Sequence, residues 1–145
     1  MADELSRLSF EQDLANALGV EDAARWKVSR AGELELLVEF TSAKAPAEIF
    51  QALLRWLEYP GFASMKFRDP ATGRLDMPTA WPVVRGFRPA TLDACVNWTL
   101  EGFNLHPEWR NDPNFKWNPS GNAVLRTLKT LQNEMDDHYT GRFKQ

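Results

Sequence analysis

The strongest pattern in the chain is an alternation of apolar and acidic side chains over residues 33–40. The even-numbered positions from Leu34 to Phe40 are all apolar, and glutamate occupies most of the odd-numbered positions. A period of two is that of a β-strand, and one apolar and one polar face predict an antiparallel sheet with one face in water. Residues 24–29 and a turn at 30–32 come before this strand, so we expect the two strands to form a hairpin.

The two ends of the chain carry apolar residues at helical spacing. Within residues 9–18 they recur every four positions from Phe10, and Gly19 follows where a helix can end. Within residues 120–141 an apolar stripe covers positions 124–135, between a serine that can cap the helix and a glycine that can end it. We therefore expect one helix at each end of the chain.

The middle of the chain is expected to hold a further helix, a further strand and a long irregular segment. Residues 46–58 begin with proline, have apolar residues at helical spacing and end before the Tyr-Pro-Gly sequence at 59–61, which predicts a short helix. Residues 63–68 are typical of a strand that ends in a turn at 69–73. Prolines recur through residues 75–120, so long regular elements are not expected there, and such segments are commonly functional.

This order of elements predicts an α+β domain, with an antiparallel sheet flanked by N-terminal and C-terminal helices. Residues 1–145 have the length of one such domain, and a hydrophobic content of 43% supplies a core. The formal net charge of −3 argues against a general nucleic-acid-binding protein, which needs a basic surface. We expect no membrane partner and a cytoplasmic location, because no apolar stretch is long enough to span a bilayer and the first residues do not resemble a secretory leader.

Few side chains are available for chemistry. The chain has one Cys and two His, which excludes an internal disulfide and makes a poor metal site, so neither a metal nor a bound cofactor is expected. Cys95 is then either a small buried hydrophobic residue or a nucleophile. It lies away from any apolar stripe, and Asn97, Asn104, His106 and Asn118 lie in the same irregular segment. This position favours the nucleophile, since amide side chains can stabilise a developing oxyanion.

The sequence around Cys95 resembles the ubiquitin-conjugating enzymes, and more closely their bacterial relatives in ubiquitin-like modification and defence operons. The similar features are an alternating strand, a Tyr-Pro sequence followed by an apolar strand, a turn, the approach to the cysteine, a His-Pro segment, and a Trp-x-Pro sequence before a helix. They lie at residues 34–40, 59–67, 69–73, 93–95, 103–109, 117–119 and 124–135. The resemblance depends on the order and spacing of these features around the only cysteine.

This resemblance implies both a fold and an activity. The fold would be UBC-like, and Cys95 would accept the C-terminal acyl group of a ubiquitin-like protein from an adenylating activating enzyme. The thioester would then pass the acyl group to an amine or hydroxyl of a target protein, in a bacterial modification or antiphage defence system. Such chemistry needs one accessible thiol and one or two hydrogen-bond donors, and no metal or cofactor.

Two features depart from that family's pattern. Eukaryotic members have a His-Pro-Asn motif upstream of the cysteine, whereas the only His-Pro sequence here, at His106, is downstream. The oxyanion donor is therefore unassigned, with Asn97 as one candidate, and His106 is a candidate for proton transfer. The short helix predicted at 46–58 would also separate the sheet from the Tyr-Pro sequence.

Two alternatives stay open beside the transferase. A catalytically inactive scaffold with the same fold would have a buried, unreactive Cys95. An unrelated α+β interaction module would lack a sheet flanked by the first and last helices.

Two other clusters are expected to be structural. The Asp-Asp-His sequence at 136–138 is expected to form a solvated helix face, because consecutive helical residues point in different directions. Four tryptophans, Trp81, Trp98, Trp109 and Trp117, are expected to pack the irregular segment, which has few aliphatic residues.

Overall fold

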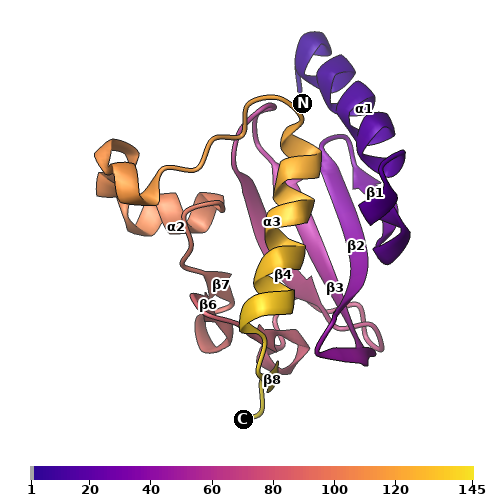
Figure 1. Ribbon diagram of the computed structural model, residues 1–145, viewed down its shortest axis with the longest axis vertical. Coiled ribbons are helices and arrows are strands. Elements are labelled where there is room, and N and C mark those ends of the chain that lie inside the picture. Colours follow the sequence, from indigo (N-terminus) through magenta and orange to yellow (C-terminus); the bar gives the residue numbers. More distant parts are fainter. Residues whose placement is uncertain (1) are drawn as a thin grey trace.

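The computed structural model describes residues 2–145 and shows an α+β fold built on a four-stranded antiparallel sheet (Figure 1). Each strand pairs with the next one along the chain, in the order β1-β2-β3-β4. The predicted α+β class is therefore confirmed. The sheet consists of β1 (Lys27–Gly32), β2 (Glu35–Ser42), β3 (Ala45–Trp56) and β4 (Ala63–Arg68), and the α-helices are α1 (Glu4–Leu18), α2 (Leu100–Leu105) and α3 (Ala123–His138).

Short elements make up much of the rest of the chain, as the prolines predict. They are the 3₁₀ turns η1 (Glu21–Arg25), η2 (Pro78–Ala80), η3 (Pro89–Thr91), η4 (Pro107–Asn111) and η5 (Pro113–Phe115), and the strands β5 (Pro82–Val83), β6 (Phe87–Arg88), β7 (Asp93–Ala94) and β8 (Gly141–Arg142). β5 pairs with β8 and β6 pairs with β7, which gives two small ribbons beside the main sheet. Across residues 2–145, no helix is long and apolar enough to cross a membrane.

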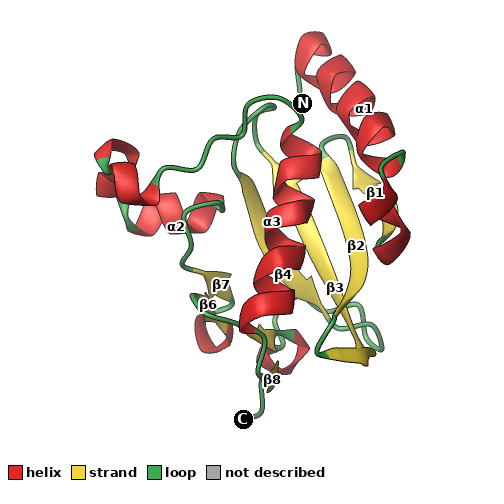
Figure 2. Cartoon of the chain, in the orientation of Figure 1, coloured by secondary structure: helices red, strands yellow, loops and turns green. Residues whose placement is uncertain are grey.

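Helices α1 and α3 pack against each other and cover one face of the sheet. Figure 1 shows α3 lying across the strands and α1 beside β1, and Figure 2 shows α2 and the neighbouring short turns on the opposite side of α3. The residues buried between these layers form one hydrophobic core, to which Phe10, Leu36, Leu54, Met65 and Leu128 contribute fully buried side chains. The sheet is thus flanked by the N-terminal and C-terminal helices, as the sequence predicts.

Helix α1 ends before Gly19 as predicted, whereas α3 has different caps from those predicted. α1 begins at Glu4 because the Asp3 carboxylate accepts a hydrogen bond from the Ser6 N–H at 2.8 Å. α3 begins at Ala123, after Asn122 rather than Ser120, since the Asn122 side chain accepts from the Leu125 N–H at 2.9 Å. Gly141 does not end α3, which stops at His138, but lies in β8.

The prediction of a short helix at residues 46–58 is wrong, because this segment is β3, the longest strand of the sheet. Its even-numbered residues from Phe50 to Trp56 are buried against the helices, and it pairs with β2 on one side and β4 on the other. Leu53 is also buried, on the opposite face of the sheet. Because it places an apolar residue between two others, the strict alternation of a strand is lost and the sequence fits a helix as well. Pairing with two neighbouring strands decides the conformation, which is a tertiary effect.

This correction removes one departure from the ubiquitin-conjugating pattern. β3 leads directly into the Tyr-Pro sequence, whose Tyr59–Pro60 peptide bond is cis, and no helix separates the two. Pro46 is tolerated in the strand because β3 pairs with β4 only from Gln51 onward, so the proline interrupts no ladder on that side.

The β1–β2 hairpin is shifted by a few residues from its prediction. β1 covers Lys27–Gly32, its turn lies at residues 33–34 rather than 30–32, and residues 21–25 form a 3₁₀ turn. The predicted alternation in the second strand is confirmed, since the even-numbered residues from Leu36 to Ser42 are buried.

Asp136 is not part of a solvated helix face but joins α3 to two other elements. Its carboxylate accepts two hydrogen bonds from the Arg25 guanidinium, at 2.7 and 2.9 Å, and one from the Ala43 N–H at 2.9 Å. Gln132 donates a further bond at 3.0 Å. The Asp136 side chain is only 22% exposed, and the Arg25 guanidinium holds the pKa of its carboxyl below the ordinary value.

We expect Asp136→Asn to lower the free energy of unfolding by about 1–2 kcal/mol at pH 7. An asparagine side chain is uncharged and has one acceptor oxygen, so it cannot accept all the hydrogen bonds that the carboxylate accepts. The folded-state pKa of Asp136 is depressed, so its contribution is fully present above the unfolded pKa, about 4, and is lost as the pH falls through the folded pKa. Urea denaturation of both proteins at several pH values measures this. A difference in stability that stays constant from pH 7 to pH 3 would contradict the expectation.

Candidate functional site around Cys95

Cys95 follows a two-stranded ribbon that holds the cysteine backbone in place. The ribbon pairs Phe87 with Ala94 and Arg88 with Asp93, and the Cys95 N–H donates to the Gly86 carbonyl at 2.7 Å. Gly86 has a φ of +86°, and a Cβ there would lie 2.7 Å from the Val96 side chain. Only glycine therefore fits both the turn and the close approach of the cysteine segment.

The charged side chains of this ribbon bind each other, so their hydrogen-bonding groups are not available for catalysis. Arg88 donates to both carboxylate oxygens of Asp93, at 2.7 Å each, and Thr91 donates to the same carboxylate. The guanidinium of Arg88 holds the pKa of Asp93 below its ordinary value. Asp93 is thus an ionised structural residue, although it lies only two positions before Cys95.

The chain after Cys95 is anchored to the edge of the sheet. Thr99 forms an isolated bridge with Ala63, and its hydroxyl donates to the Ala94 carbonyl at 2.9 Å and caps α2. The Glu101 carboxylate accepts hydrogen bonds from the Ser64 hydroxyl and from the Met65 N–H, the latter at 3.1 Å. Both contacts fix α2 against β4, so Cys95 lies between two anchored points.

Cys95 is a free, half-buried thiol in the wall of an open hollow of about 260 Å³. The other lining residues are Arg85, Gly86, Val96, Asn97, Trp98, Trp109, Phe115 and Glu134. Residues 85–86 and 95–98 supply one side, α3 supplies Glu134, and the segment after α2 supplies Trp109 and Phe115. The hollow therefore combines a thiol, a carboxylate, a guanidinium, an amide and aromatic rings.

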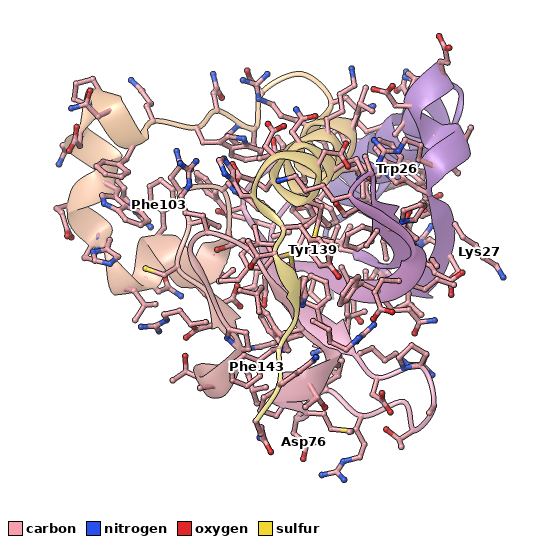
Figure 3. The ribbon with its side chains drawn as sticks, turned by 60° about the horizontal axis from the view of Figure 1, so that its bottom comes forward. Trp26, Lys27, Asp76, Phe103, Tyr139 and Phe143 are labelled. Carbon is pink, nitrogen blue, oxygen red and sulfur yellow. The ribbon has the colours of Figure 1, made fainter. Side chains whose placement is uncertain are left out.

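Trp109 and Phe115, which form an aromatic wall of the hollow, belong to residues 99–117. We call this part of the chain the α2 lobe. Figure 3 shows Phe103 in this lobe, well apart from Trp26 and Lys27 on the other side of the molecule. Phe103 packs on Phe62, with ring centroids 4.3 Å apart, and on Trp109 at 6.3 Å. Trp109 and Phe115 stack with their planes 9° apart.

The four tryptophans pack as predicted. Trp81 and Trp98 are buried against phenylalanine rings of the core, while Trp109 and Trp117 contact Phe103 and Phe62 respectively. Trp109 additionally forms part of the wall of the Cys95 hollow, a role that the packing argument does not predict.

Asn97 and His106, the other two candidate site residues, have different positions. Asn97 lines the hollow with Cys95, and its Nδ2 donates to the Phe115 carbonyl at 2.9 Å. His106 does not line the hollow. Its ring stacks on Trp109 with centroids 4.3 Å apart, and its Nδ1 lies 3.0 Å from Glu108 Oε1.

Glu134 and Arg85 line the site but are not candidates from the sequence. Glu134 lies on α3, far from Cys95 along the chain, and its role depends on where that helix crosses the sheet. No sequence signal connects the two, because the helix stripe only identifies which residues are buried. Arg85 enters the site because the turn at Gly86 lies beside the cysteine segment, a contact that only the folded chain shows.

A scan against protein-family models found no match to the chain, and searches of curated proteins and of solved structures found no similar protein. The assignment of a function therefore depends on the geometry around Cys95 and on the order of elements along the chain.

Proposed function

We propose that this chain is a ubiquitin-conjugating-like transferase that carries a ubiquitin-like protein as a thioester on Cys95. The observation that carries the proposal is the position of Cys95. It is a half-buried thiol in the wall of a polar and aromatic hollow, and α3, the helix that crosses the four-stranded sheet, contributes Glu134 to the same hollow. The UBC-like pattern implies the same order of sheet, Tyr-Pro sequence, cysteine and helix.

The first step of the proposed reaction is a transfer between thiols. The Cys95 thiolate attacks the carbonyl carbon of the acyl group on the activating enzyme, and a tetrahedral oxyanion forms. The bond to the enzyme's sulfur then breaks, the electron pair leaves with that sulfur, and the acyl group remains on Cys95. Asn97 is the oxyanion donor in this scheme, because its Nδ2 has a second hydrogen that Phe115 does not use.

The second step transfers the acyl group to a nucleophile of the target protein, and the Cys95 thiol is regenerated. The partners are therefore a ubiquitin-like protein, an adenylating activating enzyme and a target protein. A bacterial ubiquitin-like modification or antiphage defence system, in the cytoplasm, fits this set, since the thiol must stay reduced. His106 supports Trp109 in this proposal and takes no part in proton transfer.

We expect the native protein to form a thioester when it is mixed with a synthetic thioester of a short peptide that ends in glycine. The adduct should be visible by intact-protein mass spectrometry and should disappear on treatment with dithiothreitol. Cys95→Ala should abolish it, and Cys95→Ser should give a more stable oxyester. The same assay with the cognate activating enzyme, ubiquitin-like protein and ATP tests the physiological reaction.

Alkylation of the native protein by iodoacetamide separates the transferase from an inactive scaffold. Rapid labelling of Cys95, before unfolding, supports the transferase. A thiol that labels only after addition of denaturant, together with absence of the thioester adduct, would show that the chain is a non-catalytic scaffold or interaction module.

A further inference from the structure

A second hollow, separate from that of Cys95, lies on the outer face of α3. It forms where residues 117–122, the end of the loop that runs from the α2 lobe to the start of α3 in Figure 1, lie beside positions 125–133 of the helix. We call it the α3 hollow. Its volume of about 540 Å³ is within the range of small-molecule sites, about 300–1,000 Å³. It shares no lining residue with the Cys95 hollow, so it is a distinct site.

Trp117 gives the α3 hollow an aromatic ring that is already held in place. Its Nε1 donates to the Thr130 hydroxyl at 3.2 Å, and its ring centroid lies 5.4 Å from that of Phe62. The Thr130 hydroxyl in turn donates to the Arg126 carbonyl at 2.7 Å. A half-buried indole that is fixed in this way suits the stacking of a flat heteroaromatic ring, because little freedom is lost on binding.

Both charged side chains that line the α3 hollow are cations. Among residues 2–145, the Arg126 guanidinium forms no hydrogen bond or ion pair, and Lys129 has one contact, 3.6 Å long, with Asp22. That contact joins two side chains that are about half exposed, so it contributes little. No aspartate or glutamate lines the hollow. In a chain of net charge −3, this surface is therefore set apart for an anionic group, and a free guanidinium suits a phosphate.

Asn133 adds an amide that the fold does not use. Asn122, the other amide of the hollow, accepts from the Leu125 N–H and donates to the Asp13 carbonyl. In contrast, the Asn133 side chain forms no hydrogen bond within residues 2–145 and is exposed. A free amide presents a donor and an acceptor side by side, which is the pattern that pairs with the edge of adenine.

These groups follow one another along α3 in a fixed order. Arg126 and Asn133 are seven residues apart, which is about 10 Å along a helix, and Thr130, which binds Trp117, lies between them. The spacing places an anion site at one end of the hollow, an aromatic ring in the middle and a base-pairing amide at the other end. An extended nucleoside diphosphate has the same order of groups and a comparable length.

We infer that the α3 hollow binds a free nucleotide. The base stacks on Trp117 with its edge at Asn133, and the phosphates bind Arg126 and Lys129. A nucleic acid strand contains the same groups, but it needs a longer basic surface than two cations provide, and the net charge of the chain is negative. The inference is independent of any activity of Cys95.

Isothermal titration calorimetry of the full chain with ADP tests the inference. We expect ADP to bind, and adenosine and inorganic pyrophosphate each to bind at least about tenfold more weakly, because each lacks one half of the contacts. Arg126→Gln should weaken ADP binding by about tenfold or more, and Asn133→Leu should weaken ADP binding but not pyrophosphate binding. Both residues are exposed, so these variants should fold.

Arg110→Gln is the matched control, because it removes the same charge from an exposed position outside the hollow and should bind ADP like wild type. Trp117→Phe keeps a ring and should bind ADP more tightly than Trp117→Leu. Absence of ADP binding up to about 1 mM, equal affinities for ADP and pyrophosphate, or equal ADP affinities of the Arg126→Gln and Arg110→Gln proteins would overturn the inference. Tighter binding of a ten-residue oligoadenylate than of ADP would overturn the assignment to a free nucleotide.

Discussion

Replacing Gly102 with alanine is expected to lower the free energy of unfolding by at least about 3 kcal/mol and to displace the Cys95 segment. A Cβ at this position would lie 1.7 Å from the Val96 carbonyl oxygen, and 2.7 and 2.8 Å from the Val96 carbonyl carbon and nitrogen. All three are backbone atoms, so no side-chain rotation can relieve the overlap. Either α2 or the segment after Cys95 must move.

The displacement should alter the site as well as the stability. Val96 follows Cys95 directly and lines the same hollow, so a shift of its backbone changes the surroundings of the thiol. Urea denaturation measures the loss of stability, and the rate of iodoacetamide labelling in the absence of denaturant reports on the thiol. We expect iodoacetamide to label Cys95 faster than in the wild type, and the thioester adduct to be lost.

Gly19→Ala is the control for the change of residue type. A Cβ at Gly19 would meet only ordinary contacts, the closest at 3.5 Å, and its φ of −90° suits any residue. Its stability should stay within about 0.5 kcal/mol of wild type. If Gly102→Ala behaved in the same way, the close packing of α2 on the Cys95 segment would be refuted.

Phe67→Ala is expected to cost about 3–5 kcal/mol of unfolding free energy, because it removes a large, fully buried side chain from the centre of the core. The Phe67 ring contacts four others, with centroids 4.8 Å away for Trp81, 6.0 Å for Phe87, 6.2 Å for Phe40 and 6.4 Å for Phe50. It thereby joins β2 and β3 to the segment that leads to Cys95. The cavity left by the truncation would weaken both groups of contacts.

Thermal or urea unfolding of three variants tests this expectation. Phe67→Leu should lose less stability than Phe67→Ala, since it retains most of the buried volume. Leu57→Ala serves as the control, because the Leu57 side chain is 80% exposed and its truncation should change stability little. Equal losses for Phe67→Ala and Leu57→Ala would show that the aromatic cluster carries no stability.

The sequence predicts the fold class and the helices at the two ends of the chain well, because these depend on the spacing of residues that are close in the sequence. The alternation in β2 and the stripe of α3 reflect one buried face each, and a single period describes them. β3 is different, because it is buried on both faces at Leu53 and Leu54, so its residues match a helix pattern equally well. Its partners β2 and β4 decide the conformation, and pairing between strands is not visible in local spacing.

The candidate site is predicted only in part for a related reason. The lone cysteine and the nearby Asn97 could be selected from their position in the irregular segment, and both line the hollow. His106 could not be distinguished from them, because only the folded α2 lobe shows that its ring stacks on the nearby Trp109 and does not line the hollow. Glu134 and Arg85 reach the hollow from elements separated along the chain, so they require the tertiary structure.

The bonds that hold α2 to the sheet have a second effect, on association between molecules. β4 is an edge strand, and an exposed edge offers unpaired backbone groups to strands of other molecules. Thr99 and Glu101 occupy this edge at Ala63 and Met65. Any movement that lifts the α2 lobe away from the Cys95 hollow therefore also uncovers the β4 edge. The contacts of Thr99 and Glu101 therefore protect the β4 edge from pairing with strands of other molecules.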